Sequence, residues 1–423
     1  IGLVFVHGLG NFPLTERSEA RYAGVAWEML NSGDYLTPRY NGIKHFHKPP
    51  LVYWSIAACF RTFGVSELAA RVPMTLAAFA VLGLTLWLGT RMDSRRVGWS
   101  ALILLATSPF FWEMGRIAVT DMLVTFFVVL ALASAWQILE SKRASWPSFL
   151  AFWGSCGLNF LTKGPVGPLI VALVLLPYMV WGRHSFRAFR PLPGLVFAML
   201  IGVPWYGLLL AREPGLLKYF LVVQTVQRVV TDVHHRAGPV WFYLPVVLAG
   251  FLPWSLLLPE AIMRAWRSRR QSGVGPFLLL WAILPVLFFS LISSKLPPYI
   301  LPVFPALALL VARSLPALGK ASIGLTLMLS WALSLFCLLQ SRFWPIEKLT
   351  RFEPELWLAG WWMGGCALLA TAMALRRQKQ AIWAVLVVAM LGIEGLAGKA
   401  ISKVEHLSAR PLSRAILRRT QGP

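Results

Sequence analysis

Residues 121–139 read DMLVTFFVVLALASAWQIL, a run in which the one charged residue, Asp121, stands first. An α-helix rises about 1.5 Å per residue, so ~20 mostly apolar residues are enough to cross the hydrocarbon core of a bilayer. The run therefore predicts a membrane-spanning helix that begins at an acid.

The composition of the whole chain extends this prediction. Of its 423 residues, 57% are hydrophobic and only 13% are charged. Soluble domains carry about 25% charged residues, and disordered chains have low hydrophobicity. The four cysteines, Cys59, Cys156, Cys337 and Cys366, have no CxxC spacing and are interpreted as small packing residues. The sequence therefore predicts an all-α, polytopic integral membrane protein.

Other apolar runs predict further spanning helices on both sides of the first. They cover residues 70–90, 97–112, 147–162, 164–182, 192–210, 239–259, 275–293, 299–312, 321–341, 356–375 and 380–398. With the short run 1–10, which we interpret as a truncated first span, the total is about thirteen helices. We expect residues 1–398 to form one transmembrane domain and residues 399–423 to begin a truncated periplasmic tail.

Two outer segments predict helices on the membrane surface. Residues 16–31 predict one that ends at Gly33 and has Thr15 or Ser18 as its N-cap. The amphipathic segment Leu51–Phe63 predicts a second.

Basic residues sort into alternate short loops. Six loops together hold seventeen Lys and Arg residues against two acids, Asp93 and Glu140. The basic residues are Arg91, Arg95, Arg96, Lys142, Arg143, Arg183, Arg187, Arg190, Arg264, Arg267, Arg269, Arg270, Arg313, Lys320, Arg376, Arg377 and Lys379. The positive-inside rule makes these loops cytoplasmic, which explains the net charge of +23 without a nucleic-acid partner.

The opposite, periplasmic face carries the residues that suggest chemistry. Its segments 11–50, 211–238 and 342–355 mix basic residues with acids, histidines, tyrosines and prolines. Cationic candidates for binding a phosphate are Lys48, Arg228, Arg236 and Lys295, and Tyr299 is a candidate hydrogen-bond donor. Lys48 precedes Pro49 and Pro50, which favour an extended backbone before them. The alternative is that Lys48 only anchors the chain at the interface.

Two carboxylates on this face are candidate general bases, Glu19 and Asp121. Asp121 has an alternative reading as a helix cap, and an acid in a first helical turn is favourable in any case. The alternative interpretation of Glu19 is that it is only a solvated residue of an interfacial helix.

Five short motifs occur in order along the chain: Glu19-Ala-Arg21-Tyr22, His47-Lys48-Pro-Pro, Thr120-Asp121-Met, Thr162-Lys163-Gly-Pro and Lys295-Leu-Pro-Pro-Tyr299. Together they resemble the bacterial aminoarabinose transferases of lipid A and the wider protein-O-mannosyltransferase-like group with the GT-C fold. The chain departs from the family pattern at Ser18, where an acid is usual, and at His47, where the aminoarabinose transferases have Glu.

The resemblance implies a glycosyltransferase of the bacterial inner membrane. Such an enzyme transfers a sugar from a polyprenyl-phosphate donor to a lipid A-like lipid, a glycan or a protein on the periplasmic side. It implies catalytic roles for Asp121 and Glu19 and lipid-phosphate binding by Lys48 and Tyr299. Arg21, Tyr22 and Lys163 lie in the shared motifs and are candidate substrate-binding residues. His47 and His235 match positions near a divalent metal in relatives, so a metal cofactor is a further hypothesis.

A different class of function stays open, a transporter or flippase of lipid-linked glycans. A flippase needs a polar path through the bilayer, whereas this sequence concentrates its polar residues in outer loops. No Gly-rich nucleotide loop follows a strand, so a sugar nucleotide is not favoured as donor. The transferase is therefore the leading prediction.

Overall fold

The computed structural model describes residues 2–14, 16–218, 238–343 and 352–402. These residues are helical except for loops and two short strands, β1 (Arg39–Tyr40) and β2 (Ile43–Lys44). The strands pair antiparallel, with Arg39 opposite Lys44. The prediction of an all-α protein is confirmed.

The first half of the chain contains α1 (Gly2–Val6), α2 (Glu16–Ser32), α3 (Leu51–Phe63), α4 (Glu67–Met92), α5 (Arg95–Ala106), α6 (Pro109–Met114), α7 (Thr120–Ser141), α8 (Trp146–Lys163), α9 (Val166–Gly182), η1 (Phe186–Phe189), α10 (Pro191–Gly202), α11 (Pro204–Arg212) and α12 (Leu216–Lys218). The second half contains η3 (Val240–Phe242), α14 (Tyr243–Gly250), η4 (Trp254–Leu257), α15 (Leu258–Arg267), α16 (Val274–Leu291), η5 (Pro297–Val303), α17 (Phe304–Ser314), η6 (Leu315–Ala317), α18 (Lys320–Phe343), α20 (Glu353–Leu375) and α21 (Lys379–Ser402).

Fewer helices are long and apolar enough to cross a membrane than the sequence predicted. Within the described ranges seven qualify, or up to nine if each of two bent pairs counts as one span. The predicted total of about thirteen is therefore not confirmed. The chain is nevertheless a multi-pass membrane protein, because several helices are long and apolar enough to cross a bilayer and the last three of them bury only 28–33% of their apolar stretch.

Breaks or bends near prolines account for three of the predicted spans that are not single straight helices. The predicted span 97–112 is broken into α5 and α6, where Pro109 occupies the first turn of α6. The predicted span 192–210 bends by 45° before Pro204, and the span predicted at 239–259 turns by 110° between α14 and α15. Proline lacks the N–H that would continue a helix, so it starts a new helix more readily than it extends one.

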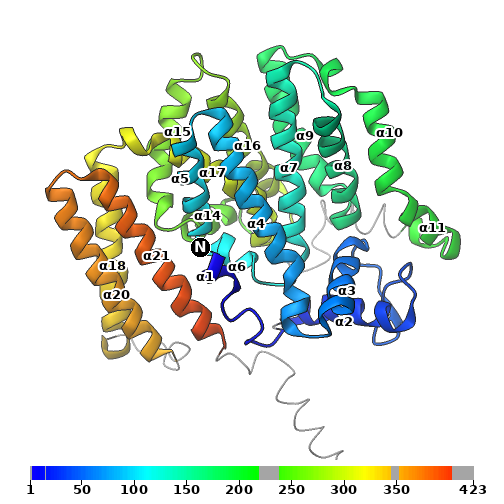
Figure 1. Cartoon of the computed structure of the whole chain (residues 1–423), viewed down its shortest axis with the longest axis horizontal. Helices are drawn as coiled ribbons and strands as arrows, with labels where there is room; N and C mark the ends of the chain where they lie inside the picture. The colour runs from blue at the N-terminus through cyan, green and yellow to red at the C-terminus, as the bar shows by residue number, and fades with distance from the viewer. Residues whose placement is uncertain (1, 15, 219–237, 344–351, 403–423) are drawn as a thin grey trace, which may run out of the picture.

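The two predicted surface helices are present as α2 and α3. Gly33 follows α2 with φ +71°, a left-handed conformation that glycine adopts without strain. Ser18 lies inside α2, so the suggestion that it caps the helix was wrong, and Thr15 lies outside the described residues. α2 and α3 lie together at one end of the helical bundle (Figure 1).

The other end of the bundle, called here the basic end, gathers the six basic loops. Arg91 at the end of α4 pairs with Glu140 at the end of α7, N to O 2.7 Å. Arg313 at the end of α17 donates to Asp93 at 3.0 Å.

The remaining basic loops join the same end through the backbone. Ala144 donates to the carbonyl of Ala188 in η1. The side chain of Arg264 donates to the carbonyl of Ala317, and Lys379 donates to that of Leu318. Because α7 is 22 residues long, about 33 Å, its first and last turns lie on opposite sides of a bilayer.

This arrangement predicts which ends can be labelled from outside the cell. We expect a membrane-impermeant maleimide to label Ile43→Cys, beside α2, but not Arg270→Cys at the basic end, in a variant whose native cysteines are replaced. Both positions are exposed, so accessibility to water does not separate them. The measurement is labelling of intact spheroplasts, with lysed cells as the control. Labelling of position 270 alone would reverse the topology.

Candidate active site

A buried ion pair organises the end of the molecule where α2 and α3 lie. The carboxylate of Glu19 accepts two hydrogen bonds from Arg71, each 2.9 Å long. Glu19 is 2% exposed and Arg71 is 0% exposed. A buried pair of this kind is stable only when its further donors and acceptors are also satisfied.

Arg71 satisfies that requirement through the segment that precedes α2. Its terminal nitrogens donate to the carbonyls of Leu9, Phe12 and Pro13 at 2.8–2.9 Å. The guanidinium also lies 3.6 Å from the centre of the Phe12 ring, within cation–π range. One arginine of α4 therefore holds α2 and the residues before it.

The same pair fixes the approach to α7. The backbone N–H of Ala118 donates to Glu19 at 2.7 Å. Two residues earlier, Arg116 donates to the carbonyls of Val4, Phe5 and His7 at 2.8–2.9 Å. The loop before α7 is thus fixed by contacts to Glu19 and to residues 4–7. Asp121 follows this loop directly, in the first turn of α7.

Asp121 meets residues from two other motifs. Its Oδ1 lies 2.6 Å from the Nζ of Lys163, the last residue of α8. That ammonium lies 4.7 Å from the centre of the Tyr299 ring, in η5. The Asp121 side chain is 13% exposed and that of Lys163 is 8% exposed. Three predicted residues from distant parts of the chain therefore form one partly accessible cluster, called here the Asp121 cluster.

The position of Lys163 follows from its turn. Gly164 has φ +71° and ends α8 directly after the lysine, so the chain turns sharply there into α9. Consecutive antiparallel helices bring the start of α7 and the end of α8 to the same side.

Lys48 reaches this region through its neighbours. Phe46 and Leu51, on either side of it, pack against a small apolar cluster formed by Leu161, Trp205 and Leu209. Leu161 lies two residues before Lys163, so the loop that carries Lys48 is packed on the helix end that carries the Asp121 cluster. Lys48 itself is half-buried.

Arg21 and the histidines form a second polar group on the same face. The rings of His45 and His47 stack with centroids 4.4 Å apart. Burial, His47 and Arg21 together lower the pKa of His45 to about 4. His45 is therefore a neutral imidazole near neutral pH. Tyr22 is buried and packs at 5.7 Å from the ring of Tyr53 on α3.

The remaining predicted residues are placed differently. Lys295 is 6% exposed, and its Nζ donates to the carbonyl of Ile292 at 2.7 Å. Arg228, His235 and Arg236 lie outside the described residues. Gly238, the first described residue after them, lies against the Lys295 side chain.

The metal hypothesis finds no ligand set in the described part of the chain. There, no three His, Cys, Asp or Glu side chains come together as a metal site. The parallel rings of His45 and His47 direct their nitrogens along parallel planes rather than to a shared point. His47 would have to act with His235, which is not described.

Arg71 is a residue of the candidate site's surroundings that the sequence did not lead us to predict. It stands inside the apolar run predicted as span 70–90, and such a charge needs a buried partner. That isolated charge was the available signal, and Glu19 was the acid to pair with it.

We expect loss of the Glu19–Arg71 pair to destabilise the protein. Glu19→Gln leaves the Arg71 charge buried without its counter-ion, a change that costs about 3–5 kcal/mol. The apparent melting temperature in detergent should fall clearly. Glu28→Gln, on the same helix, is the control, because Glu28 only accepts hydrogen bonds from the exposed turn at Asn41 and Gly42. Equal melting temperatures for the two variants would contradict this account.

Known proteins resemble the chain over most of its length. A family model described as dolichyl-phosphate-mannose-protein mannosyltransferase matches residues 47–207. The undecaprenyl phosphate-alpha-4-amino-4-deoxy-L-arabinose arabinosyl transferase 2 of Sodalis glossinidius is 33% identical over 344 residues, which is 80% of this chain and 62% of that protein. The corresponding transferase of Edwardsiella ictaluri is 36% identical over 304 residues, which is 71% of this chain and 55% of that protein. The chain thus spans less than two thirds of these curated relatives.

Solved structures give the same relationship. The crystal structure of ArnT from Cupriavidus metallidurans bound to undecaprenyl phosphate has a TM-score of 0.83 and 28% identity, and the match covers 98% of this chain and 77% of that one. The apo oligosaccharyltransferase of Archaeoglobus fulgidus has a TM-score of 0.50 at 16% identity, which is a likeness of fold alone. The chain therefore has the GT-C fold and is related in sequence, over most of its length, to the undecaprenyl-phosphate aminoarabinose transferases.

Proposed function

We propose that the chain is a membrane glycosyltransferase that moves a sugar from a polyprenyl-phosphate donor to an acceptor. The names of its relatives support undecaprenyl phosphate as the carrier and aminoarabinose as the sugar. For the acceptor we propose a lipid A-like lipid, because the shared motifs resemble those of the aminoarabinose transferases of lipid A. The reaction takes place at the end of the bundle that holds α2 and α3.

One observation carries the proposal: Asp121, Lys163 and Tyr299 meet in the Asp121 cluster. Each belongs to a different motif shared with the transferases, and 42 residues separate Asp121 from Lys163 along the chain. A carboxylate, an ammonium and a phenol at one place match the needs of transfer from a lipid phosphate.

The chemistry explains why these residue types suffice. When the sugar leaves its donor, the polyprenyl phosphate departs as an anion and needs no proton. Cations are required to hold that anion, and we assign Lys48 and Lys163 to this task, with the Tyr299 hydroxyl as a donor. The acceptor hydroxyl or phosphate must lose a proton as it attacks, and Asp121 is the base.

Glu19 has a different part in this proposal. Both of its oxygens accept from Arg71, and one also accepts from Ala118. A carboxylate so engaged and 2% exposed is a poor base for an acceptor that arrives from outside. We therefore replace the sequence-based assignment of Glu19 as a second base with a positioning role for the loop that carries Asp121.

A transporter or flippase is less well supported. The curated relatives are named as transferases, and the polar candidates among the described residues gather at one end rather than along a path. We place the protein in the bacterial inner membrane, with the Asp121 cluster on the periplasmic side. The charge of the basic end supports this orientation.

A divalent metal remains a separate proposal for His47 and His235, and no step above depends on it. Its test is activity and bound-metal content before and after chelator treatment. Unchanged activity in fully metal-free protein would end it.

We expect Asp121→Asn to lower turnover by about 10²–10⁴-fold, the usual contribution of a general base. The helix should persist, because Val119 is the N-cap and the Asp121 side chain makes no capping hydrogen bond. The measurement is sugar transfer from a polyprenyl-phosphate sugar in proteoliposomes, at matched amounts of folded protein.

Two variants make this measurement decisive. Asp34→Asn, in an outer loop where amide oxygen can still accept from Leu36 and Thr37, should remain active. Glu19→Gln should lower the amount of folded protein more than the turnover of what remains. Normal transfer by Asp121→Asn would remove the base from the mechanism.

We expect Lys48→Ala to weaken use of the donor. Loss of a charge-assisted hydrogen bond costs about 1.5–3 kcal/mol, which is roughly tenfold to over a hundredfold in affinity. Arginine at this position should restore activity only in part, because its planar fork differs from a compact ammonium.

Lys44→Ala is the matched control, because Lys44 is exposed in β2 and its partner is Glu213. An exposed pair contributes little stability. Equal KM values for the donor in the two alanine variants would show that Lys48 only anchors the loop.

A further inference from the structure

A hollow lined by charged and polar residues lies at the basic end, across the bundle from the Asp121 cluster. Its volume is about 400 Å³, within the range of ligand pockets, roughly 300–1,000 Å³. Three segments form its walls: the turn between α4 and α5 at Asp93, the end of α15 with the following turn, and the end of α17 with η6. We call it the arginine hollow.

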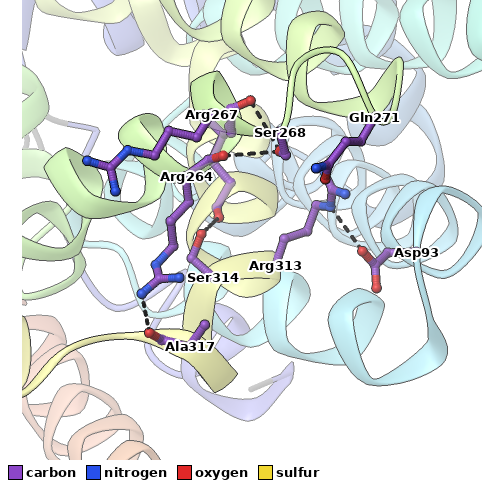
Figure 2. Close-up of a pocket in the computed structure, with 10 residues that line it drawn as sticks. Asp93, Arg264, Arg267, Ser268, Gln271, Arg313, Ser314 and Ala317 are labelled. Atoms are coloured by element: carbon purple, nitrogen blue, oxygen red, sulfur yellow. Dashed lines mark hydrogen bonds and ion pairs between the residues drawn. The ribbon is translucent and has the colours of Figure 1, made fainter.

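Arginines line two sides of the hollow. Figure 2 shows Arg264 and Arg267 of α15 on one side, and Arg313 of α17 with Gln271 and Asp93 on the other. Arg313 uses its Nε to donate to Asp93 at 3.0 Å, which leaves both Nη groups for another acceptor. Its side chain is 21% exposed, so these donors can be reached.

Arg264 and Arg267 add further donors. Arg264 donates from its Nε and one Nη to Glu260, and from the same Nη to the carbonyl of Ala317. Its other Nη makes no hydrogen bond with the described residues. The Arg267 guanidinium makes none with them either. With Asp93 and Glu260 counted against the three arginines, one positive charge remains in excess.

Aromatic side chains place the hollow at the depth of lipid headgroups. Trp266, on the last turn of α15, is 51% exposed, and Trp181 at the end of α9 is 53% exposed. Their rings lie 6.5 Å apart, and the guanidinium of Arg269 lies 4.3 Å from the Trp266 ring. Exposed tryptophans beside arginines are typical of the membrane–water interface.

We propose that the arginine hollow binds the phosphate of an anionic glycerophospholipid from the leaflet at the basic end. Phosphate oxygens accept well from the fixed donors of guanidinium groups. Basic pockets between helices on the positively charged side of a membrane protein suit such headgroups. Met263, 45% exposed on α15, and Trp266 offer apolar surface for the acyl chains. The proposal is independent of the transferase activity.

The test compares lipid binding by delipidated wild-type protein and by Arg267→Gln/Arg313→Gln. The probes are dioleoyl-phosphatidylglycerol, dioleoyl-phosphatidylcholine and inorganic phosphate, followed by native mass spectrometry and by the shift in melting temperature. We expect wild type to bind phosphatidylglycerol best and the double variant to bind it at least tenfold more weakly. Arg187 is exposed in η1 at the same end but outside the hollow, so Arg187→Gln should bind within twofold of wild type.

A second variant tests the space rather than the charge. Ala317→Trp places a bulky ring at the exposed edge of the hollow and keeps every arginine, so it should also lose phosphatidylglycerol. Equal loss in Arg187→Gln would mean that surface charge alone attracts the lipid and would overturn the proposal. Binding of phosphatidylcholine or of inorganic phosphate as tight as that of phosphatidylglycerol would overturn the assignment to an anionic lipid. Undiminished binding of phosphatidylglycerol by both hollow variants would overturn the placement of the lipid in the hollow.

Discussion

The buried pair of Glu19 and Arg71 is the constraint on which the end of the bundle with α2, α3 and the Asp121 cluster depends. Neither side chain has access to water, so each charge needs the other. Arg71 also takes three carbonyls from residues 9–13, and Glu19 takes the N–H of Ala118. Four segments therefore meet at one ion pair: the residues before α2, α2 itself, and, from farther along the chain, α4 and the loop before α7. This pair therefore fixes the start of α7 and the position of Asp121.

Much of the fold was predictable because membrane-spanning helices are coded by simple apolar runs. The predicted span 121–139 became α7, Thr120–Ser141, and the interfacial segment Leu51–Phe63 became α3 with the same bounds. The number of spans was not predictable in the same way. A hydropathy run averages over a proline, so it passes through Pro109 or Pro204 without a break, although the backbone does not.

The candidate site was also predictable only in part. The motifs identified Asp121, Lys163 and Tyr299 one by one, and the antiparallel course of α7 and α8 implies that the first two lie on the same side. Their contact at 2.6 Å, however, depends on how far each helix extends, which a turn at Gly164 decides. The pairing of Glu19 with Arg71 was not predicted, because a motif gives residue types and not the partner that a buried charge requires.

The pair of Asp121 and Lys163 suggests how the two halves of the proposed reaction are coupled. The ammonium of Lys163 contacts the carboxylate of Asp121 and lies over the Tyr299 ring. As the sugar leaves, the phosphodiester of the donor becomes a phosphate monoester with a third acceptor oxygen and more negative charge, so in the proposed mechanism it competes with Asp121 for the same ammonium. The lysine then exchanges one anion for the other. In the proposed mechanism, Asp121 then loses its partner at the step in which the acceptor needs a base, so its carboxylate becomes available as the sugar is transferred.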